Sequence, residues 1–183
     1  MFITETNLAG CFIIHPKVFE DERGYFLETY KKNSISEILG YETDFVQDNE
    51  SSSKYGVIRG LHMQRGEFAQ SKLVRVLSGT ILDTAVDVRK GSPTFGQHVS
   101  VELSGDNKKQ LFIPKGFLHG FSVLSETAVV FYKCDAYYHQ SSEDGCHPLD
   151  KDLNIDWQIP PEAVTLSQKD SQAPSFSAFN PFS

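Results

Sequence analysis

Short apolar runs separated by polar turns recur along most of the chain and predict antiparallel β structure. Residues 72–90, KLVRVLSGTILDTAVDVRK, contain two such runs joined by a Ser-Gly pair, which is a hairpin signal. Residues 98–114 repeat this form around a Ser-Gly-Asp-Asn turn, and residues 120–138 repeat it around a Ser-Glu turn. Strands this short and this regularly spaced are typical of a sandwich or a barrel.

Helical patterning is sparse. Residues 33–41, NSISEILGY, predict one helix, with Asn33 or Ser34 as its N-cap and Gly40 as its terminator. Residues 161–183 are polar, with serine, proline and scattered phenylalanine, and predict an irregular chain or a short helix packed on the body. We find no internal repeat and no linker, so we expect a single domain over residues 1–183.

Composition and net charge limit the kinds of molecule that this protein can bind. The chain has 183 residues, of which 39% are hydrophobic, so it has enough apolar material for a substantial core. Its formal net charge of −7 argues against a nucleic-acid partner and against anionic membrane surfaces. An anionic ligand would therefore need a local basic pocket.

Two further features indicate the cellular setting. The N-terminal residues lack the basic and apolar regions of a signal peptide, and no apolar run approaches membrane-spanning length. The three cysteines, Cys11, Cys134 and Cys146, are scattered and odd in number, which favours reduced thiols over a disulfide framework or a zinc site. We therefore expect a cytoplasmic protein.

Residues 56–64, GVIRGLHMQ, predict a strand that carries two polar functional groups, Arg59 and His62. One interpretation is a half-exposed polar pair on an edge strand. The other is a catalytic base beside an anion-binding guanidinium. Strict alternation places the two side chains on opposite faces, so a shared site requires a bulge, for which Gly60 is the obvious place.

The segment 113–120, IPKGFLHG, lies between two predicted strands and contains Pro-x-Gly-x-x-His ending at His119. This pattern resembles the second motif of the cupin jelly-roll superfamily. In metal cupins that histidine joins a His-x-His pair and a glutamate from the first motif to hold a metal ion. The corresponding place here reads His62-Met63-Gln64, without the second histidine, which predicts a cupin that has lost its metal.

Longer stretches make the resemblance specific. The chain resembles the dTDP-4-dehydrorhamnose 3,5-epimerase family over nearly its whole length and in the family's order. The matching stretches are 19–30, 45–64, 72–96, 111–126, 132–138 and 166–170. The resemblance implies an all-β, cupin-like antiparallel jelly roll with a few short helices, no cofactor and a homodimer. It also implies an isomerase that converts dTDP-4-dehydro-6-deoxyglucose to dTDP-4-dehydrorhamnose.

Inverting a carbon next to a ketone requires a base, an electrophile for the enolate oxygen, and an acid on the opposite face. The resemblance assigns the base to His62 and its orienting carboxylate to Asp170. It places Lys72 at the C4 oxyanion and makes Tyr132 the acid. The residues alone also fit a solvated tail aspartate, a lysine at a sheet edge and a core tyrosine.

Asp83 lies in the run ILDTAVD, where alternation could turn it inward. A buried aspartate needs a partner, so we interpret it as the group that holds Lys72 or His119. The alternative is a surface carboxylate.

The nucleotide part of the substrate brings two phosphates and a base. Arginine suits bidentate phosphate contacts, amides suit the sugar or the base, and aromatic rings can flank the base. The residues expected to bind substrate are Arg23, Phe26, Glu28, Gln47, Asn49, Arg59, His119 and Tyr138, with Phe19, Lys72 and Lys115 as further candidates. The resemblance implies that Arg23 and Glu28 act in the neighbouring subunit's site. Each of these residues also fits an ordinary surface or core position.

The chain departs from the family within residues 143–157, where members carry Trp-Asn-Asp and this sequence reads Pro148-Leu149-Asp150. The change affects a loop expected to close over the sugar or the base. It leaves open an epimerase that inverts one centre or uses another nucleotide sugar. A non-catalytic sugar-binding cupin and a metal-dependent cupin enzyme are also compatible with a jelly roll. The catalytic set argues against the former, and Gln64 argues against the latter.

Overall fold

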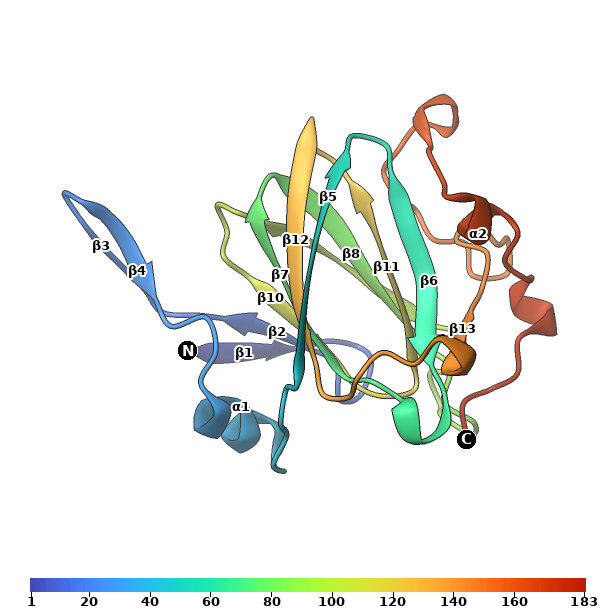
Figure 1. Ribbon diagram of the computed structural model, residues 1–183, viewed down its shortest axis with the longest axis horizontal. Coiled ribbons are helices and arrows are strands. Elements are labelled where there is room, and N and C mark those ends of the chain that lie inside the picture. Colours follow the sequence, from blue (N-terminus) through green and yellow to red (C-terminus); the bar gives the residue numbers. More distant parts are fainter.

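Two antiparallel sheets pack face to face in the computed structural model, which describes residues 1–183 (Figure 1). The six-stranded sheet has the order β1-β2-β10-β7-β12-β5. Its strands are β1 (Phe2–Glu5), β2 (Phe12–His15), β5 (Gln47–Lys54), β7 (Lys72–Ser78), β10 (Gln110–Ile113) and β12 (Thr127–Cys134). The expected all-β jelly roll is confirmed.

The second sheet has five strands in the order β13-β6-β11-β8-β9. They are β6 (Ile58–Gln64), β8 (Thr80–Asp87), β9 (His98–Ser104), β11 (Phe117–Val123) and β13 (Glu143–Gly145). The main core fills the space between the sheets, with Val74 and Val130 from one meeting Val101 and Phe121 from the other.

The turns after Ser78, Ser104 and Leu124 lie where the sequence places them, but the hairpins predicted around them are wrong. Strands β7, β10 and β12 belong to the six-stranded sheet, whereas β8, β9 and β11 belong to the five-stranded sheet. Each turn therefore carries the chain from one sheet to the other. A turn residue sets where a strand ends, whereas the choice of partner depends on distant strands.

The predicted helix is α1 (Lys32–Leu39), and Gly40 ends it in the left-handed region with φ 73°. The predicted N-cap is wrong, because Lys31 occupies that position and no side chain caps the first turn. Ile35 is buried against Leu73 and Phe112, so packing on the sheet stabilises a helix that lacks a polar cap.

Residues 161–183 run irregularly over the outer face of the five-stranded sheet, as expected, and contain one short helix, α2 (Gln168–Ser171). The remaining single turns are η1 (Gly66–Phe68), η2 (Gln140–Ser142), η3 (Pro161–Ala163) and η4 (Phe176–Ala178). Phe179 packs with Trp157 and Leu118 in a second apolar cluster behind the sheet. None of the helices is long and apolar enough to cross a membrane.

A separate hairpin of β3 (Val18–Asp21) and β4 (Gly24–Leu27) projects away from the body (Figure 1). Phe19, Tyr25 and Phe26 are all exposed on it. Large apolar side chains on a protruding hairpin are typical of a surface that another chain covers.

Candidate active site

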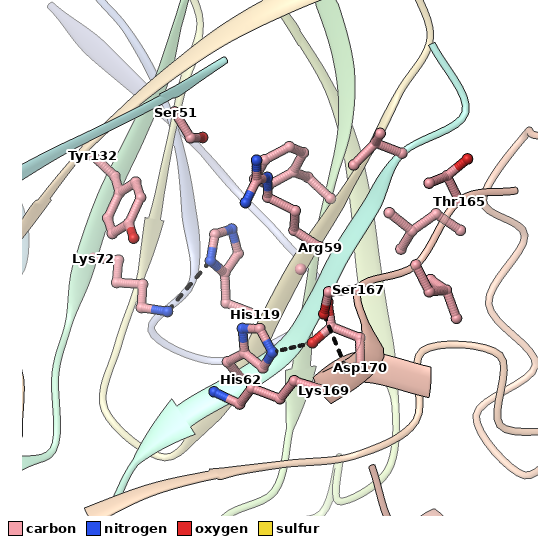
Figure 2. Close-up of a pocket in the computed structure, with 15 residues that line it drawn as sticks. Ser51, Arg59, His62, Lys72, His119, Tyr132, Thr165, Ser167, Lys169 and Asp170 are labelled. Atoms are coloured by element: carbon pink, nitrogen blue, oxygen red, sulfur yellow. Dashed lines mark hydrogen bonds and ion pairs between the residues drawn. The ribbon is translucent and has the colours of Figure 1, made fainter. Parts of the chain in front are cut away.

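A pocket of about 400 Å³ lies between the two sheets and the C-terminal segment (Figure 2). Its charged and aromatic lining includes Arg59 and His62 from β6, Lys72 from β7, His119 from β11, Tyr132 from β12 and Asp170 from α2. A second pocket of about 270 Å³ shares His62, Lys72 and Tyr132 with the first. The two pockets therefore form one site with two lobes.

A bulge in β6 brings Arg59 and His62 into the same pocket, which confirms the expected offset at Gly60. His62 pairs with His119 and Arg59 pairs with Phe121, so two residues of β6 face the single Gly120 of β11. Gly60 has φ 132°, and a Cβ there would lie 2.6 Å from the Cα of Gly120. Only glycine fits this close approach.

His62 and Asp170 form a histidine–aspartate pair whose imidazole is partly exposed to the pocket. His62 Nε2 lies 2.6 Å from Asp170 Oδ1, and the His62 side chain is 31% exposed while that of Asp170 is 4% exposed. Burial alone would raise the pKa of Asp170, but the hydrogen bond with His62 and its charge hold that pKa below the usual value. The carboxylate therefore stays ionised beside the imidazole.

This geometry defines which nitrogen of His62 can act. A carboxylate only accepts hydrogen bonds, so Nε2 carries the proton and Nδ1 keeps the lone pair. The helix cap supports the arrangement, because the Asp170 backbone N–H donates to the Ser167 hydroxyl at 3.1 Å. The remaining nitrogen, Nδ1, makes no hydrogen bond within the protein.

The imidazole of a second histidine–aspartate pair contacts Lys72 and is hardly exposed to solvent. His119 Nε2 lies 2.8 Å from Asp83 Oδ1, and Lys72 Nζ lies 3.4 Å from His119 Nδ1. Asp83 is fully buried and turns inward to His119, one of the two partners that the sequence suggested for it. Both nitrogens of His119 are engaged, so Lys72 is the member of this Asp83–His119–Lys72 series that can offer its charge to the pocket.

Burial determines the direction in which the pKa values of His119 and Lys72 shift. It lowers the pKa of the His119 imidazole, with the Lys72 charge acting in the same direction and Asp83 opposing it. Burial also lowers the pKa of the Lys72 ammonium. Strand β7 lies between β10 and β12, so Lys72 does not guard a sheet edge. A partly desolvated ammonium in a pocket is suited to an anionic oxygen.

Tyr132 lies on the same side of the pocket as Lys72, away from His62 and Asp170 (Figure 2). Lys72 Nζ lies 5.8 Å from the centre of its ring, and the His119 ring meets it edge-on at 6.4 Å. Burial raises the pKa of the Tyr132 phenol. The phenol is therefore protonated at neutral pH and can give up a proton to a strong base.

Polar side chains of β5 and the loop after β12 line the second lobe. Gln47 accepts a hydrogen bond from the Tyr138 backbone N–H at 2.8 Å and donates to Asn49 Oδ1 at 3.0 Å. The Tyr138 hydroxyl donates to Glu143 Oε2 at 3.0 Å, and its ring is 53% exposed. Gln47, Asn49 and the half-exposed Tyr138 thus line the second lobe together.

Arg59 reaches the first lobe with its guanidinium anchored on β5. Its Nε donates to the Ser53 hydroxyl at 3.0 Å. The arginine is exposed and has no carboxylate partner, so its charge is available to an anion.

Sequence reasoning did not single out Ser51, Gln70, Glu143 and Lys169, all of which line the pockets. Lys169 Nζ pairs with Glu143 Oε1 at 2.5 Å. Lys169 falls in a stretch that resembles the family, which was a usable signal. Glu143 lies on a three-residue strand with no pattern of its own.

Three of the expected substrate-binding residues lie away from the two lobes of their own chain. Arg23 pairs with Asp21 at 2.5 Å on the projecting hairpin, and Phe26 is exposed beside it. Glu28 follows the hairpin and lines neither lobe. The cation proposed at Lys115 pairs with Asp135 at 3.5 Å instead.

The altered run at residues 148–150 does not line either lobe. The Pro148 carbonyl accepts a hydrogen bond from Trp157 Nε1 at 2.8 Å, and Asp150 Oδ2 accepts one from the Phe176 backbone N–H at 2.9 Å. The run therefore braces the C-terminal segment and does not close over the pocket.

The side chains present do not form a metal centre. No three His, Cys, Asp or Glu side chains come together in an arrangement that could hold a metal ion. Gln64, at the place of the missing histidine, lines the second lobe.

The architecture and the pocket define a class first: the chain is an isomerase built on a cupin-like jelly roll. It belongs to the dTDP-4-dehydrorhamnose 3,5-epimerase family, whose model matches residues 5–178.

Individual relatives agree with this assignment. The dTDP-4-dehydrorhamnose 3,5-epimerase of Salmonella typhimurium is 50% identical over 174 residues, which cover 95% of this chain and 94% of the relative. The crystal structure of the enzyme of that name from Elizabethkingia anophelis has a TM-score of 0.95 and 52% identity over 98% of each chain. A dTDP-6-deoxy-D-glucose-3,5-epimerase from Legionella pneumophila, in complex with dTDP-4-keto-L-rhamnose, has a TM-score of 0.94 and 50% identity. That match covers 98% of this chain and 94% of the Legionella chain.

Proposed function

We propose that this chain converts dTDP-4-dehydro-6-deoxyglucose to dTDP-4-dehydrorhamnose by inverting C3 and C5 without a cofactor. The observation that supports it best is the His62–Asp170 pair, which faces Lys72 and Tyr132 across one pocket. The relatives named above act on this class of substrate, and one of them was solved with a dTDP-linked keto sugar.

In the first step His62 Nδ1 removes the proton from the carbon next to the ketone. The electron pair of the C–H bond moves into the ring and onto the C4 oxygen, forming an enolate. The Lys72 ammonium offsets the charge on that oxygen, and the Asp170 carboxylate stabilises the imidazolium. Both charges exist before the reaction, so the site needs little reorganisation.

In the second step the Tyr132 phenol donates its proton to the opposite face of the same carbon. The enolate collapses to the ketone with the configuration inverted. The resulting phenolate regains a proton from solvent, and His62 releases its proton to solvent, which restores the site. Repeating both steps at the other carbon next to C4 gives the doubly inverted sugar.

In this proposal the base and its sugar occupy the second lobe, where Gln47 and Asn49 offer hydrogen bonds. Arg59, which lines the first lobe, binds a phosphate oxygen. Tyr138 stacks on the base with its exposed ring.

The proposal includes a homodimer whose hairpins complete each other's sites. The hairpin of β3 and β4 holds Arg23 and Phe26 away from the pocket of its own chain, with both side chains exposed. A second copy related by a two-fold axis would bring these residues, with Glu28, to the neighbouring pocket. Arg23 would then give the diphosphate a second guanidinium.

The decisive experiment is incubation with dTDP-4-keto-6-deoxyglucose in D₂O, with deuterium counted at C3 and C5 of substrate and product. We expect deuterium at both carbons with the wild type and at neither with His62→Ala. Asp170→Asn should fold normally and lose most of the rate, because the imidazolium loses its support. Deuterium at one carbon only would indicate a single-centre epimerase. A protein that binds dTDP but incorporates no deuterium at either carbon would be a sugar-binding cupin.

Activity should not depend on a metal. Dialysis of the purified enzyme against a chelator should leave the rate unchanged, because only one histidine remains of the His-x-His ligand pair. A stoichiometric metal whose removal abolishes turnover would contradict the cofactor-free proposal.

A further inference from the structure

Gln64 occupies the place where metal cupins carry a second histidine, and its side chain has acquired a different set of contacts. It is the last residue of β6, two positions after His62, and it is only 4% exposed. Its strand partner is Glu143 on β13, and it lines the second lobe of the site.

The amide of Gln64 uses both donors and its acceptor on main-chain groups. Nε2 donates to the carbonyl of Phe68 at 2.8 Å and to the carbonyl of Tyr137 at 3.2 Å. Oε1 accepts from the backbone N–H of His139 at 2.6 Å. Two carbonyls and one N–H define the orientation of the amide, because the reverse orientation would set donor against donor.

These contacts bracket Tyr138 on both sides. The Tyr137 carbonyl and the His139 N–H belong to the peptide groups that flank it, and the Tyr138 N–H is held by Gln47. The Phe68 and His139 rings stack at 3.8 Å, which joins the two segments that Gln64 holds. Tyr138 is 53% exposed, so packing holds its ring only weakly. The ring is instead positioned by these backbone contacts at one end and by the hydrogen bond of its hydroxyl to Glu143 at the other.

A histidine could not replace this amide. A neutral imidazole has one donor and one acceptor, so at least one of the three main-chain groups would stay unpaired. An unpaired buried group costs free energy, and the loop would rearrange to reach water. The residue that removes the metal ligand is thus also the residue that orders the loop.

We propose that Gln64 is a positioning residue that holds the Tyr138 ring ready for the base of a nucleoside diphosphate. This inference rests on the nucleotide lobe of the proposed function. Loss of the amide should free the loop, so binding would have to order it again. The cost falls on nucleotide binding and not on the proton transfers at the sugar.

The test measures dTDP binding and steady-state turnover of Gln64→Met, which keeps the side-chain length and removes all three hydrogen bonds. We expect the Kd for dTDP and the KM to rise about fivefold to tenfold. The kcat at saturating substrate should stay within about twofold of wild type. A general loss of folded protein would lower kcat and leave KM unchanged.

Two further variants make the test specific. The double variant Gln64→Met/Tyr138→Ala should bind dTDP no more weakly than Tyr138→Ala alone, because Gln64 acts through that ring. Ser122→Ala is the control, since it removes another buried bond, from Ser122 Oγ to the Trp157 carbonyl at 2.7 Å, outside both lobes. Its KM should match that of the wild type.

An unchanged Kd in folded Gln64→Met would overturn the proposal, as would an equal loss in Ser122→Ala or a further loss in the double variant. If Gln64→Met does not fold, hydrogen exchange on the wild type decides. The His139 amide should exchange at least about tenfold more slowly than an unprotected amide without nucleotide, and unprotected exchange would overturn the role. Wild-type protein that neither binds dTDP nor exchanges the sugar protons would instead overturn the proposed function.

Discussion

Two histidine–aspartate pairs contribute their histidines to one pocket, and their surroundings give them different capacities. His62 is 31% exposed and keeps one nitrogen free, whereas His119 is 6% exposed and has both nitrogens engaged. The first pair can exchange a proton with a ligand, and the second can only orient Lys72. The same two residue types thus supply a base in one place and a support in the other.

Tyr132→Phe should separate exchange from inversion. The variant retains His62, Asp170 and Lys72, so the substrate should still form its enolate and take up deuterium on the original face. Inverted product should form at least about 100-fold more slowly, because the acid on the other face is missing. The measurement is deuterium in recovered substrate against product formed, with mass spectrometry or NMR.

Tyr41→Phe is the control, since Tyr41 is exposed at the end of α1 and lines neither lobe. Both of its rates should match the wild type. If Tyr132→Phe loses exchange and inversion in equal proportion, Tyr132 positions the substrate and does not act as the acid.

At the scale of elements, β6 and the turn after β8 show how main chain and side chain cooperate. The bulge at Gly60 sets His62 and Arg59 on one face, and the main chain of Gly60 also lowers the pKa of Asp170. The turn after β8 depends on a single buried carboxylate, Asp87. Each element therefore has one residue on which its geometry depends.

Gly60→Ala should destabilise the protein by more than about 2 kcal/mol, because the new Cβ meets the Gly120 backbone and the backbone angle disfavours alanine. Gly91→Ala is the matched control: its φ is 76°, and a Cβ there meets nothing within 4 Å. It should cost only about 1 kcal/mol. Urea denaturation of the two variants measures the loss of unfolding free energy. Equal losses in the two variants would show that the backbone of β11 moves to accommodate the new Cβ at no energetic cost.

Asp87 should make stability depend on pH. Burial alone would raise its pKa, but hydrogen bonds from Arg89, Ser92 and Thr94 lower it to about 2. Its pKa in the folded state lies below the ordinary value, so its contribution is complete above about pH 4 and declines as pH falls toward 2. Asp87→Asn should cost about 2 kcal/mol at pH 7.

The destabilisation by Asp87→Asn should shrink by about 1 kcal/mol between pH 7 and pH 3, as measured by denaturation at both values. Asp106→Asn, at an exposed aspartate in the turn after β9, should show little destabilisation at either pH. A loss for Asp87→Asn that does not change with pH would mean that its hydrogen bonds matter and its charge does not.

At the scale of the whole molecule, the pocket and the projecting hairpin lie on separate parts of the chain. The lobes hold the groups for proton transfer and Arg59, while Arg23 and the exposed aromatic rings lie on the hairpin. Arg59 is therefore the arginine that one chain places in its own pocket, while Arg23 lies on the hairpin.

Mixing Arg23→Ala with His62→Ala subunits should restore activity if the hairpin acts in the neighbouring site. Each mixed dimer would contain one pocket with both residues intact, so equal mixing should give about a quarter of the wild-type activity. The control mixes His62→Ala with Asp170→Asn, whose partners lie in one chain and cannot complement. If activity after subunit exchange only equals the average of the two unmixed variants, Arg23 acts in the site of its own chain or in no site.

The sequence by itself determined the strands, the turns and the terminating Gly40, because these follow from alternation and from local backbone preferences. It also indicated the bulge at Gly60, since two functional residues on one strand required it. Family resemblance in the sequence indicated His62, Lys72 and Tyr132 as site residues, and the structure places all three in one pocket.

Only the tertiary structure decided which strands pair. The apparent hairpins cross between sheets because pairing depends on contacts with strands far away in the sequence. The local residue pattern did not single out Asp170; the resemblance paired it with His62, and the fold brings the two side chains, 108 residues apart, within 2.6 Å. Gln64 shows the same limit: the sequence reveals a missing ligand, whereas its three main-chain partners come from segments that only folding brings together.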